Sequence, residues 1–556
     1  MSDLASSPSP VQSTEAIGQG EISSKSQRQG YASFFCFASS YWLICHIWPS
    51  SLTVSIHILD DDSLLNVFYL YRPFLLGEGE DETSRLIGGE GGWVRGRWWY
   101  NLAHVCQRWR KVILGSASYL GVSLVCANGT PVADMLAHSP PLPLVIDYKI
   151  DEDADISAED EEHAILALKR YDCVRHVRFL MPVTSLQNLI AAMDDEYPIL
   201  EHLIIMNLDA EESSILIIPE TLQAPHLRHL TLIGFTLPIR SRLLTTAVDL
   251  VTLYLSMVHP SAYLHPNTLL QWLSSMPQLE TLIFGFVFPV PNRDVEMQLT
   301  HTHITAPVAI LNLRSFTFQG AGAYLEAIIH RLTAPSLEML RISIFNQLTF
   351  SVPRLVHFVD TTENLRFKRA KFEFGDHEVR MKVYPHEEAK MYALYMIVDC
   401  YHLDWQVSSA AQISSSLSPT FSAVEHLTLG HSVHNHSSGE HNEADPIEWR
   451  KLLRSFRNVK TLRIAEGLVK DLSRCLELDD GGLPLELLPE LQELTYSGSG
   501  NTGDAFTSFI DARQDTGRSI SLIRHSPSPD PGSSVPSVEP PSITPAPGEG
   551  GSDLDT

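Results

Sequence analysis

Apolar residues recur along the chain in a six-residue pattern, apolar-x-x-apolar-x-apolar, that returns ten times between Val174 and Tyr496. Its apolar positions would line one side of a short strand, and the stretches between copies have room for a helix or a turn. Recurrence at intervals of mostly about 23–35 residues predicts a solenoid, because no such repeat buries its apolar side without a neighbour. The copies start at Val174, Leu200, Leu227, Leu250, Leu279, Leu313, Leu337, Val424, Val459 and Leu491.

Prolines mark the turns between the predicted helices and strands. In five copies a proline lies two residues before the first apolar position, where its missing N–H stops a helix from continuing. Helix-like patterns precede two of these prolines, at 268–273 and 324–332. The predicted unit is therefore strand, loop, helix and proline turn, and the predicted fold class is an α/β solenoid similar to leucine-rich repeats. The five prolines are Pro198, Pro225, Pro277, Pro335 and Pro489.

The pattern fades in one place and extends weakly beyond both ends. Between Ile342 and Val424 we expect one or two degenerate repeats at 350–385 and a loop at about 402–422. Short apolar runs at 144–146 and 519–523 are further strand candidates. The expected organisation is a disordered or poorly defined segment at 1–55, a helical module at 56–126, a connector at 127–169, the solenoid at 170–525 and a disordered acidic tail at 526–556.

Two helix-sized patterns lie in the module at 56–126. The first follows Asp60, whose side chain suits a helix start, and the second carries basic residues on its other face. Between them, residues 77–98 contain seven glycines and are predicted as a flexible insertion. Each pattern has apolar residues at i, i+3, i+4 and i+7, namely Leu64, Val67, Phe68 and Tyr71 in the first and Leu102, Val105, Cys106 and Trp109 in the second.

These two segments resemble the F-box, a three-helix module of about 45 residues. The resemblance lies in the run Asp62-Ser-Leu-Leu-Asn-Val-Phe and, more specifically, in Val105-Cys-Gln-Arg-Trp-Arg. Over about 56–525 the chain is similar to fungal F-box proteins of the basidiomycete type, which have a leucine-rich-repeat-like C-terminal region. The usual Leu-Pro opening of the motif is replaced here by Leu59-Asp60.

The resemblance implies that the module docks on a Skp-type adaptor and, through it, on a cullin. The residues alone leave another interpretation open, in which both helices cap the solenoid. With the resemblance, the expected adaptor-binding residues are Leu64, Leu65, Val67, Phe68, Leu102, Val105, Cys106 and Trp109.

The formal net charge is −26, which disfavours binding to phosphate backbones unless a local basic patch compensates. The run 151–162 contains eight carboxylates in twelve positions and is expected to be a solvated loop rather than a metal or partner site.

The seven cysteines are scattered without a C-x-x-C pair, which indicates reduced thiols and a cytoplasmic or nuclear protein. The aromatic-rich run 31–47 has the length of a membrane span, but His46, Pro49 and several serines argue against one. A buried segment, a gene-model error and a membrane tether all remain open for this run.

Catalytic and ligand-binding motifs are weak. Gly498–Gly503 matches G-x-G-x-x-G but lies in the last repeat, where too few strands follow to build a dinucleotide-binding half. His431, His434, His436 and His441 lie in a Ser- and Gly-rich stretch, predicted as a solvated loop rather than a zinc site. We therefore expect no enzyme activity and no catalytic, cofactor-binding or metal-binding residues.

The expected function is that of a substrate receptor in a Skp–cullin–F-box ubiquitin ligase, with a repeat scaffold unconnected to ubiquitin as the alternative. The target protein, the signal that marks it and the oligomeric state are left open. The strand positions expected to be exposed and to form part of the target-binding surface are His202, Ile204, His229, Thr231, Thr252, Tyr254, Thr281 and Ile283.

Overall fold

A computed structural model describes the chain in eleven stretches and divides it into two compact units, Met1–Tyr69 and Leu70–Thr556. Of the first unit, residues 59–69 are described; they include most of helix α2 (Asp61–Tyr71). The expectations for 1–55, for nearly all of the insertion at 77–98, for Gly498–Gly503 and for the tail at 526–556 fall outside the described residues. The described stretches are 59–71, 98–150, 156–209, 216–238, 240–258, 264–287, 307–345, 352–432, 444–476, 487–497 and 505–525.

The second unit is built on one sixteen-stranded sheet. All neighbouring strands are parallel except where β15 pairs antiparallel with β14 and β16. The strands in spatial order are β1 (Leu124–Ala127), β2 (Leu144–Lys149), β3 (Val174–Met181), β4 (His202–Asn207), β6 (His229–Ile233), β8 (Thr252–Val258), β9 (Thr281–Phe286), β11 (Ser315–Gly320), β13 (Met339–Ile344), β16 (Leu394–Asp399), β15 (Glu378–Tyr384), β14 (Arg369–Gly375), β17 (His426–Ser432), β18 (Thr461–Ile464), β19 (Glu493–Ser497) and β20 (Ser521–His525).

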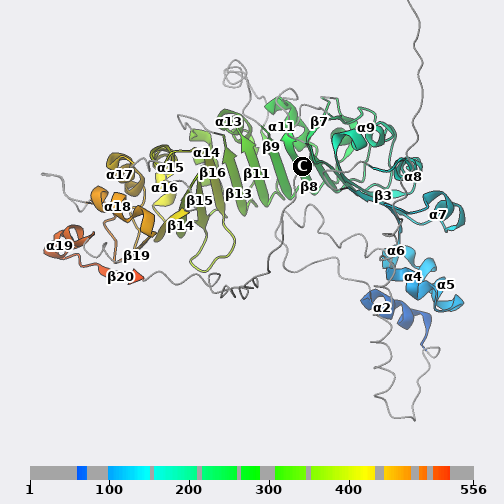
Figure 1. The fold of residues 1–556 in the computed structure, drawn as a ribbon, viewed down its shortest axis with the longest axis horizontal. Coiled ribbons are helices and arrows are strands. Elements are labelled where there is room, and N and C mark those ends of the chain that lie inside the picture. Colours follow the sequence, from blue (N-terminus) through cyan, green and yellow to red (C-terminus); the bar gives the residue numbers. More distant parts are fainter. Residues whose placement is uncertain are drawn as a thin grey trace, which may run out of the picture. The chain divides into compact units, whose positions relative to one another are not determined.

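Helices connect most of these strands and lie along one side of the sheet, as α9, α11, α13, α14, α15 and α17 show in Figure 1. Two small parallel pairs, β5 (Leu216–Ile217) with β7 (Phe235–Thr236) and β10 (Val308–Ala309) with β12 (Leu332–Thr333), supplement them. The connecting helices are α7 (Val132–His138), α8 (Ala158–Leu168), α9 (Val183–Ala191), α10 (Arg242–Thr246), α11 (Pro266–Ser274), α13 (Gly322–Ile329), α14 (Pro353–Thr361), α15 (Leu403–Ser416), α16 (Ser418–Phe421), α17 (Pro446–Arg454), the 3-10 turn η5 (Glu466–Leu468), α18 (Val469–Leu476) and α19 (Thr507–Asp515).

The apolar pattern is the core of this sheet. All thirty apolar positions of the ten copies are at most 3% exposed. Their second and third positions pair across neighbouring strands, so that Leu230, Leu253 and Leu282 are successive Cα partners. The structure thus confirms a large, mostly parallel α/β sheet with helices, which is consistent with the solenoid-like arrangement predicted from the repeats.

The sheet begins earlier than the expected start of the repeats at 170. β1 and β2 join it through parallel pairing with β3, so the stretch expected to be a connector supplies two strands. The acidic run was also expected to be a loop, but Ala158 begins α8 within it. Ser157 caps this helix by accepting a hydrogen bond from the Asp160 amide, and carboxylates in a first turn are favoured by the helix dipole.

The weak stretch between Ile342 and Val424 contains a reversal of the chain. α14 leads past two strand positions to β14, the chain returns through β15 and β16, and α15 with α16 crosses back to β17. The loop expected at 402–422 is therefore wrong, because a crossover over two strands needs a helix-length connection. The expected degenerate repeats at 350–385 are instead α14 and the β14–β15 hairpin.

The last repeat is closed by a buried arginine. Arg513 of α19 donates hydrogen bonds to the carbonyl oxygens of Leu488 (3.0 Å), Pro489 (3.1 Å) and Leu491 (3.3 Å). The guanidinium thereby ties α19 to the turn before β19 and supplies donors to carbonyl oxygens where unpaired buried polar groups would be costly.

The buried apolar side chains at paired positions on neighbouring strands are here called rungs. Shortening the side chain of one rung tests whether the rungs stabilise one another. Leu253→Ala removes a fully buried side chain between two neighbours and is expected to lower the free energy of unfolding by about 2–5 kcal/mol in urea titration. The control, Leu311→Ala, makes the same change at a side chain that is 63% exposed and should stay within about 0.5 kcal/mol. Equal effects of the two variants would contradict the assignment of this row to the core.

Candidate protein-interaction surfaces

Helix α2 divides its apolar residues between a buried and an exposed set. Leu64 and Phe68, one turn apart, are buried, and Leu65 is half-buried. Val67 is 44% exposed and Leu70 is 74% exposed. The predicted stripe is therefore only partly correct: its i and i+4 positions are buried, whereas the i+3 position is open to contact with another molecule.

The second predicted helix is interrupted at the motif. α4 (Trp98–Ala103) ends before α5 (Gln107–Gly115), and Val105 between them is 58% exposed. Cys106 is extended and its Sγ accepts a hydrogen bond from the Trp109 amide at 3.4 Å, so the cysteine begins α5. Leu102, Cys106 and Trp109 are half-buried.

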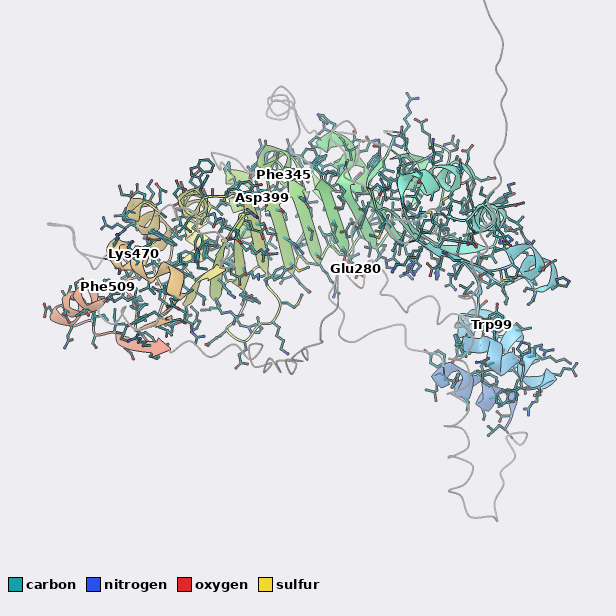
Figure 2. All side chains as sticks on the ribbon, viewed as in Figure 1. Trp99, Glu280, Phe345, Asp399, Lys470 and Phe509 are labelled. Atoms are coloured by element: carbon teal, nitrogen blue, oxygen red, sulfur yellow. The ribbon has the colours of Figure 1, made fainter. Side chains whose placement is uncertain are left out.

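Arg110 and Trp99 hold this helical segment in place. The Arg110 Nε donates to the Ala103 carbonyl at 3.0 Å, which links the last residue of α4 to α5. The indole N–H of Trp99, which is labelled in Figure 2, donates to the Ser123 carbonyl at 3.1 Å, just before β1. Sequence reasoning missed Trp99, although its spacing of four from Ala103 indicates a common helix face. The segment ends with α6 (Ala117–Leu120).

The second candidate surface is the sheet face opposite the core rungs, here called the open face. Strand alternation places every second residue on it. His202, His229, Tyr254, Thr281 and Ile283 lie on this face and are half-buried. Three other positions expected to be exposed are instead buried, because side chains on strands about 4.8 Å apart cover one another. These three are Ile204, Thr231 and Thr252.

One row on the open face starts with a buried ion pair. Arg178 of β3 donates to both carboxylate oxygens of Asp147 on β2, at 2.7 and 2.9 Å. Both side chains are buried, so the pair depends on this bidentate geometry to offset desolvation.

Histidines from three neighbouring strands stack on the same face. The His176 and His202 ring centroids lie 4.4 Å apart at 79°, and those of His202 and His229 lie 4.4 Å apart at 15°. Burial lowers the pKa of His202 to about 2 and lowers the pKa of His176 and His229 below the usual imidazole value. The imidazoles are therefore neutral at pH 7.

Glu201 lies beside this stack. Its carboxylate is 2.9 Å from the Arg175 Nε and 3.9 Å from the His176 Nε2. The interaction with His176, followed by that with Arg175, lowers the Glu201 pKa to about 2, so the side chain is ionised at neutral pH.

Basic side chains gather further along the open face. Successive Cα partners in one row are Arg341, Tyr395, Lys382 and Lys371. The Arg341 guanidinium carbon lies 5.0 Å from the Tyr395 ring centroid, and the Lys382 Nζ lies 5.7 Å from it. Such cation–π contacts hold the charges over a buried ring.

Carboxylates partly neutralise this basic row. Glu373 pairs with Lys371 at 2.5 Å and with Lys382 at 2.9 Å, and these two ammonium groups keep the pKa of Glu373 below its usual value despite burial. Glu378 pairs with Arg380. Figure 2 labels Asp399, which ends β16 and has a pKa raised by burial and by Glu378.

The Asp147–Arg178 pair generates a stability prediction. Asp147→Asn or Arg178→Gln alone leaves a buried charge without its counter-ion and is expected to lower the free energy of unfolding by about 3–5 kcal/mol in urea titration. Replacing both with Leu and Met should cost much less than the sum of the single changes. The exposed Arg170–Asp172 pair, 3.7 Å apart, is the control, and Asp172→Asn should cost less than about 1 kcal/mol. Additive single and double changes at Asp147 and Arg178 would contradict the coupling.

Comparison with known proteins adds no family assignment. No helix among the described stretches has the length and apolar character needed to cross a membrane; residues 31–47 lie outside them. No protein-family model matches the chain, and a search of curated proteins finds no match.

Proposed function

We propose that this protein is the substrate receptor of a Skp–cullin–F-box type ubiquitin ligase. In this proposal α2 and the α4–α5 segment bind a Skp-type adaptor, and the open face of the sheet binds the target protein. The observation on which the proposal chiefly depends is the set of exposed apolar side chains in the region with the F-box-like sequence: Val67 and Leu70 on α2, and Val105 in the turn between α4 and α5.

Exposed apolar side chains on short helices and their connecting turns are available to dock on a partner, and burying each one stabilises a complex by about 1.5–3 kcal/mol. The buried Leu64 and Phe68 then belong to the fold, and the contact residues among those expected from the sequence reduce mainly to Val67 and Val105.

The receptor would act by proximity and would perform no covalent chemistry itself. Holding a target near a charged conjugating enzyme raises the effective concentration of its lysines, which speeds transfer without a catalytic group on the receptor. A long sheet with an open face suits this role because it offers a wide, preorganised surface to another macromolecule.

Adaptor binding provides the direct test. Full-length protein should co-elute with purified Skp-type adaptor in size-exclusion chromatography. Val67→Asp combined with Val105→Asp should weaken the complex more than about tenfold, because charges would replace buried apolar contacts. Binding is measured by titration calorimetry.

The control is Val248→Asp, which makes the same change at an exposed valine of the repeat region. It should bind the adaptor like the unaltered protein, and all variants should keep the same circular dichroism spectrum. Unchanged affinity of the double variant would refute these contacts. Absence of binding by the unaltered protein would favour the repeat scaffold unconnected to ubiquitin.

A further inference from the structure

The histidine stack on the open face brings together three metal-type donors. One donor atom each from His176, Glu201 and His202 lies within 4.8 Å of the other two. The arrangement follows from the sheet: His176 and His202 are Cα partners on β3 and β4, and Glu201 immediately precedes His202. Three donors are thus held by backbone pairing rather than by a loop.

The donor set suits a borderline transition-metal ion. Zn²⁺ accepts imidazole nitrogen and carboxylate oxygen at about 2.0–2.2 Å, so tetrahedral ligands lie roughly 3.3 Å apart. Closing the present cluster onto an ion therefore needs side-chain shifts on the order of 1 Å.

The neighbouring side chains are compatible with an ion. Arg175 approaches one oxygen of Glu201, and a carboxylate has lone pairs for both a guanidinium and a metal. His229 stacks on His202, and one of its ring nitrogens lies 3.2 Å from the Thr252 hydroxyl oxygen, which holds the ring against His202.

We propose that His176, Glu201 and His202 form a binding site for a divalent transition-metal ion of the zinc type on the open face of the sheet. Three protein ligands leave one coordination position for water or for a donor from a bound macromolecule. This site is independent of adaptor binding.

The test uses full-length protein treated with a chelator and then titrated with Zn²⁺ against a chromophoric competitor. One equivalent should bind, and the melting temperature should rise with Zn²⁺ because the ion binds the folded state. His202→Phe keeps an aromatic ring in the stack but removes the ligand. It should weaken binding more than about 100-fold, since loss of even an outer-shell partner costs about 10–100-fold.

His226→Gln is the matched control, because His226 is exposed and is not a member of the cluster. Its Nδ1 lies 3.3 Å from a carboxylate oxygen of Asp249. It should leave Zn²⁺ binding unchanged, and Glu201→Gln should weaken it. Tight binding that survives both His202→Phe and Glu201→Gln would place the ion elsewhere and overturn the proposal. Absence of binding by the unaltered protein would overturn it as well.

A separate observation, the charge of the open face between β13 and β18, indicates the class of target. On this stretch the outward-facing strand positions carry six basic side chains and three carboxylates, in a chain whose formal net charge is −26. They are Arg341, Arg369, Lys371, Arg380, Lys382 and Arg463, with Glu373, Glu378 and Asp399.

Two of the arginines are positioned over aromatic rings. Arg341 lies over Tyr395, and the Arg369 guanidinium carbon is 4.0 Å from the Tyr384 ring centroid. A guanidinium held in this way has lost part of its rotamer freedom before binding and can pair with a carboxylate in a bidentate manner.

We infer that this basic stretch of the open face, which contains the basic row of Arg341, Lys382 and Lys371, binds an acidic, extended segment of the target protein. This inference rests on the proposed function, because it names the class of target that the receptor would recognise. Complementary charge favours such a partner here, whereas the acidic remainder of the surface repels it and thereby directs it to this row.

The probe is a fluorescent Asp/Glu-rich peptide, with a neutral Ser/Gly peptide for comparison, measured by fluorescence anisotropy on the full chain. The acidic peptide should bind more tightly, and added salt should weaken it. Arg341→Glu combined with Lys382→Glu should reduce its affinity more than about tenfold. The control, Lys169→Glu with Arg314→Glu, makes the same charge change at exposed residues outside the row.

Adaptor affinity is measured for the same variants and should be unchanged by charge reversal on the row. This measurement distinguishes a failure of this inference from a failure of the proposed function. Equal loss of peptide binding in the control pair would show a general charge effect and overturn the assignment. Tighter binding of single-stranded nucleic acid than of the acidic peptide would also overturn it.

Discussion

Burial of each apolar rung between the rungs of its neighbours is the interaction on which the rest of this structure depends. Leu253 is covered because Leu230 and Leu282 occupy the same register on the adjoining strands. A single repeat has no comparable partner, so the free energy of folding belongs to the interfaces between repeats. In the final repeat Arg513 adds a polar link, because its guanidinium donates to three backbone carbonyls of the turn before β19.

The alternation that produces the rungs also produces the open face. Within each strand, the residues that alternate with the rung positions point away from the helices, and register then lines them up across many strands. His176, His202 and His229 come together in this way, with Glu201 beside them just before β4, and so do Arg341, Lys382 and Lys371. The clusters of polar side chains on this surface thus arise from pairing between strands that are distant in sequence, and no loop is needed to bring their members together.

The reversal at β14–β16 shows how the sheet tolerates a change of connection. Leu340, Leu394, Val383 and Ala370 continue the same rung although β15 runs in the opposite direction. Continuity of the buried row is what the fold preserves, while strand direction can vary where long helical crossovers bring the chain back. The reversal also concentrates basic residues, because the hairpin alternates apolar and charged side chains.

The sequence by itself determined the rungs and the strand–helix unit, because periodicity records which side of each element is buried. It could also have indicated the β14–β15 hairpin, where apolar and charged residues alternate strictly on both sides of Gly375-Asp376. Only the tertiary structure decided the rest: the break at Val105, the exposure of Val67, the strand order around β15 and the meeting of His176 with Glu201 and His202. These features depend on which distant segments pair and in what register, and local residue patterns contain no information on that choice.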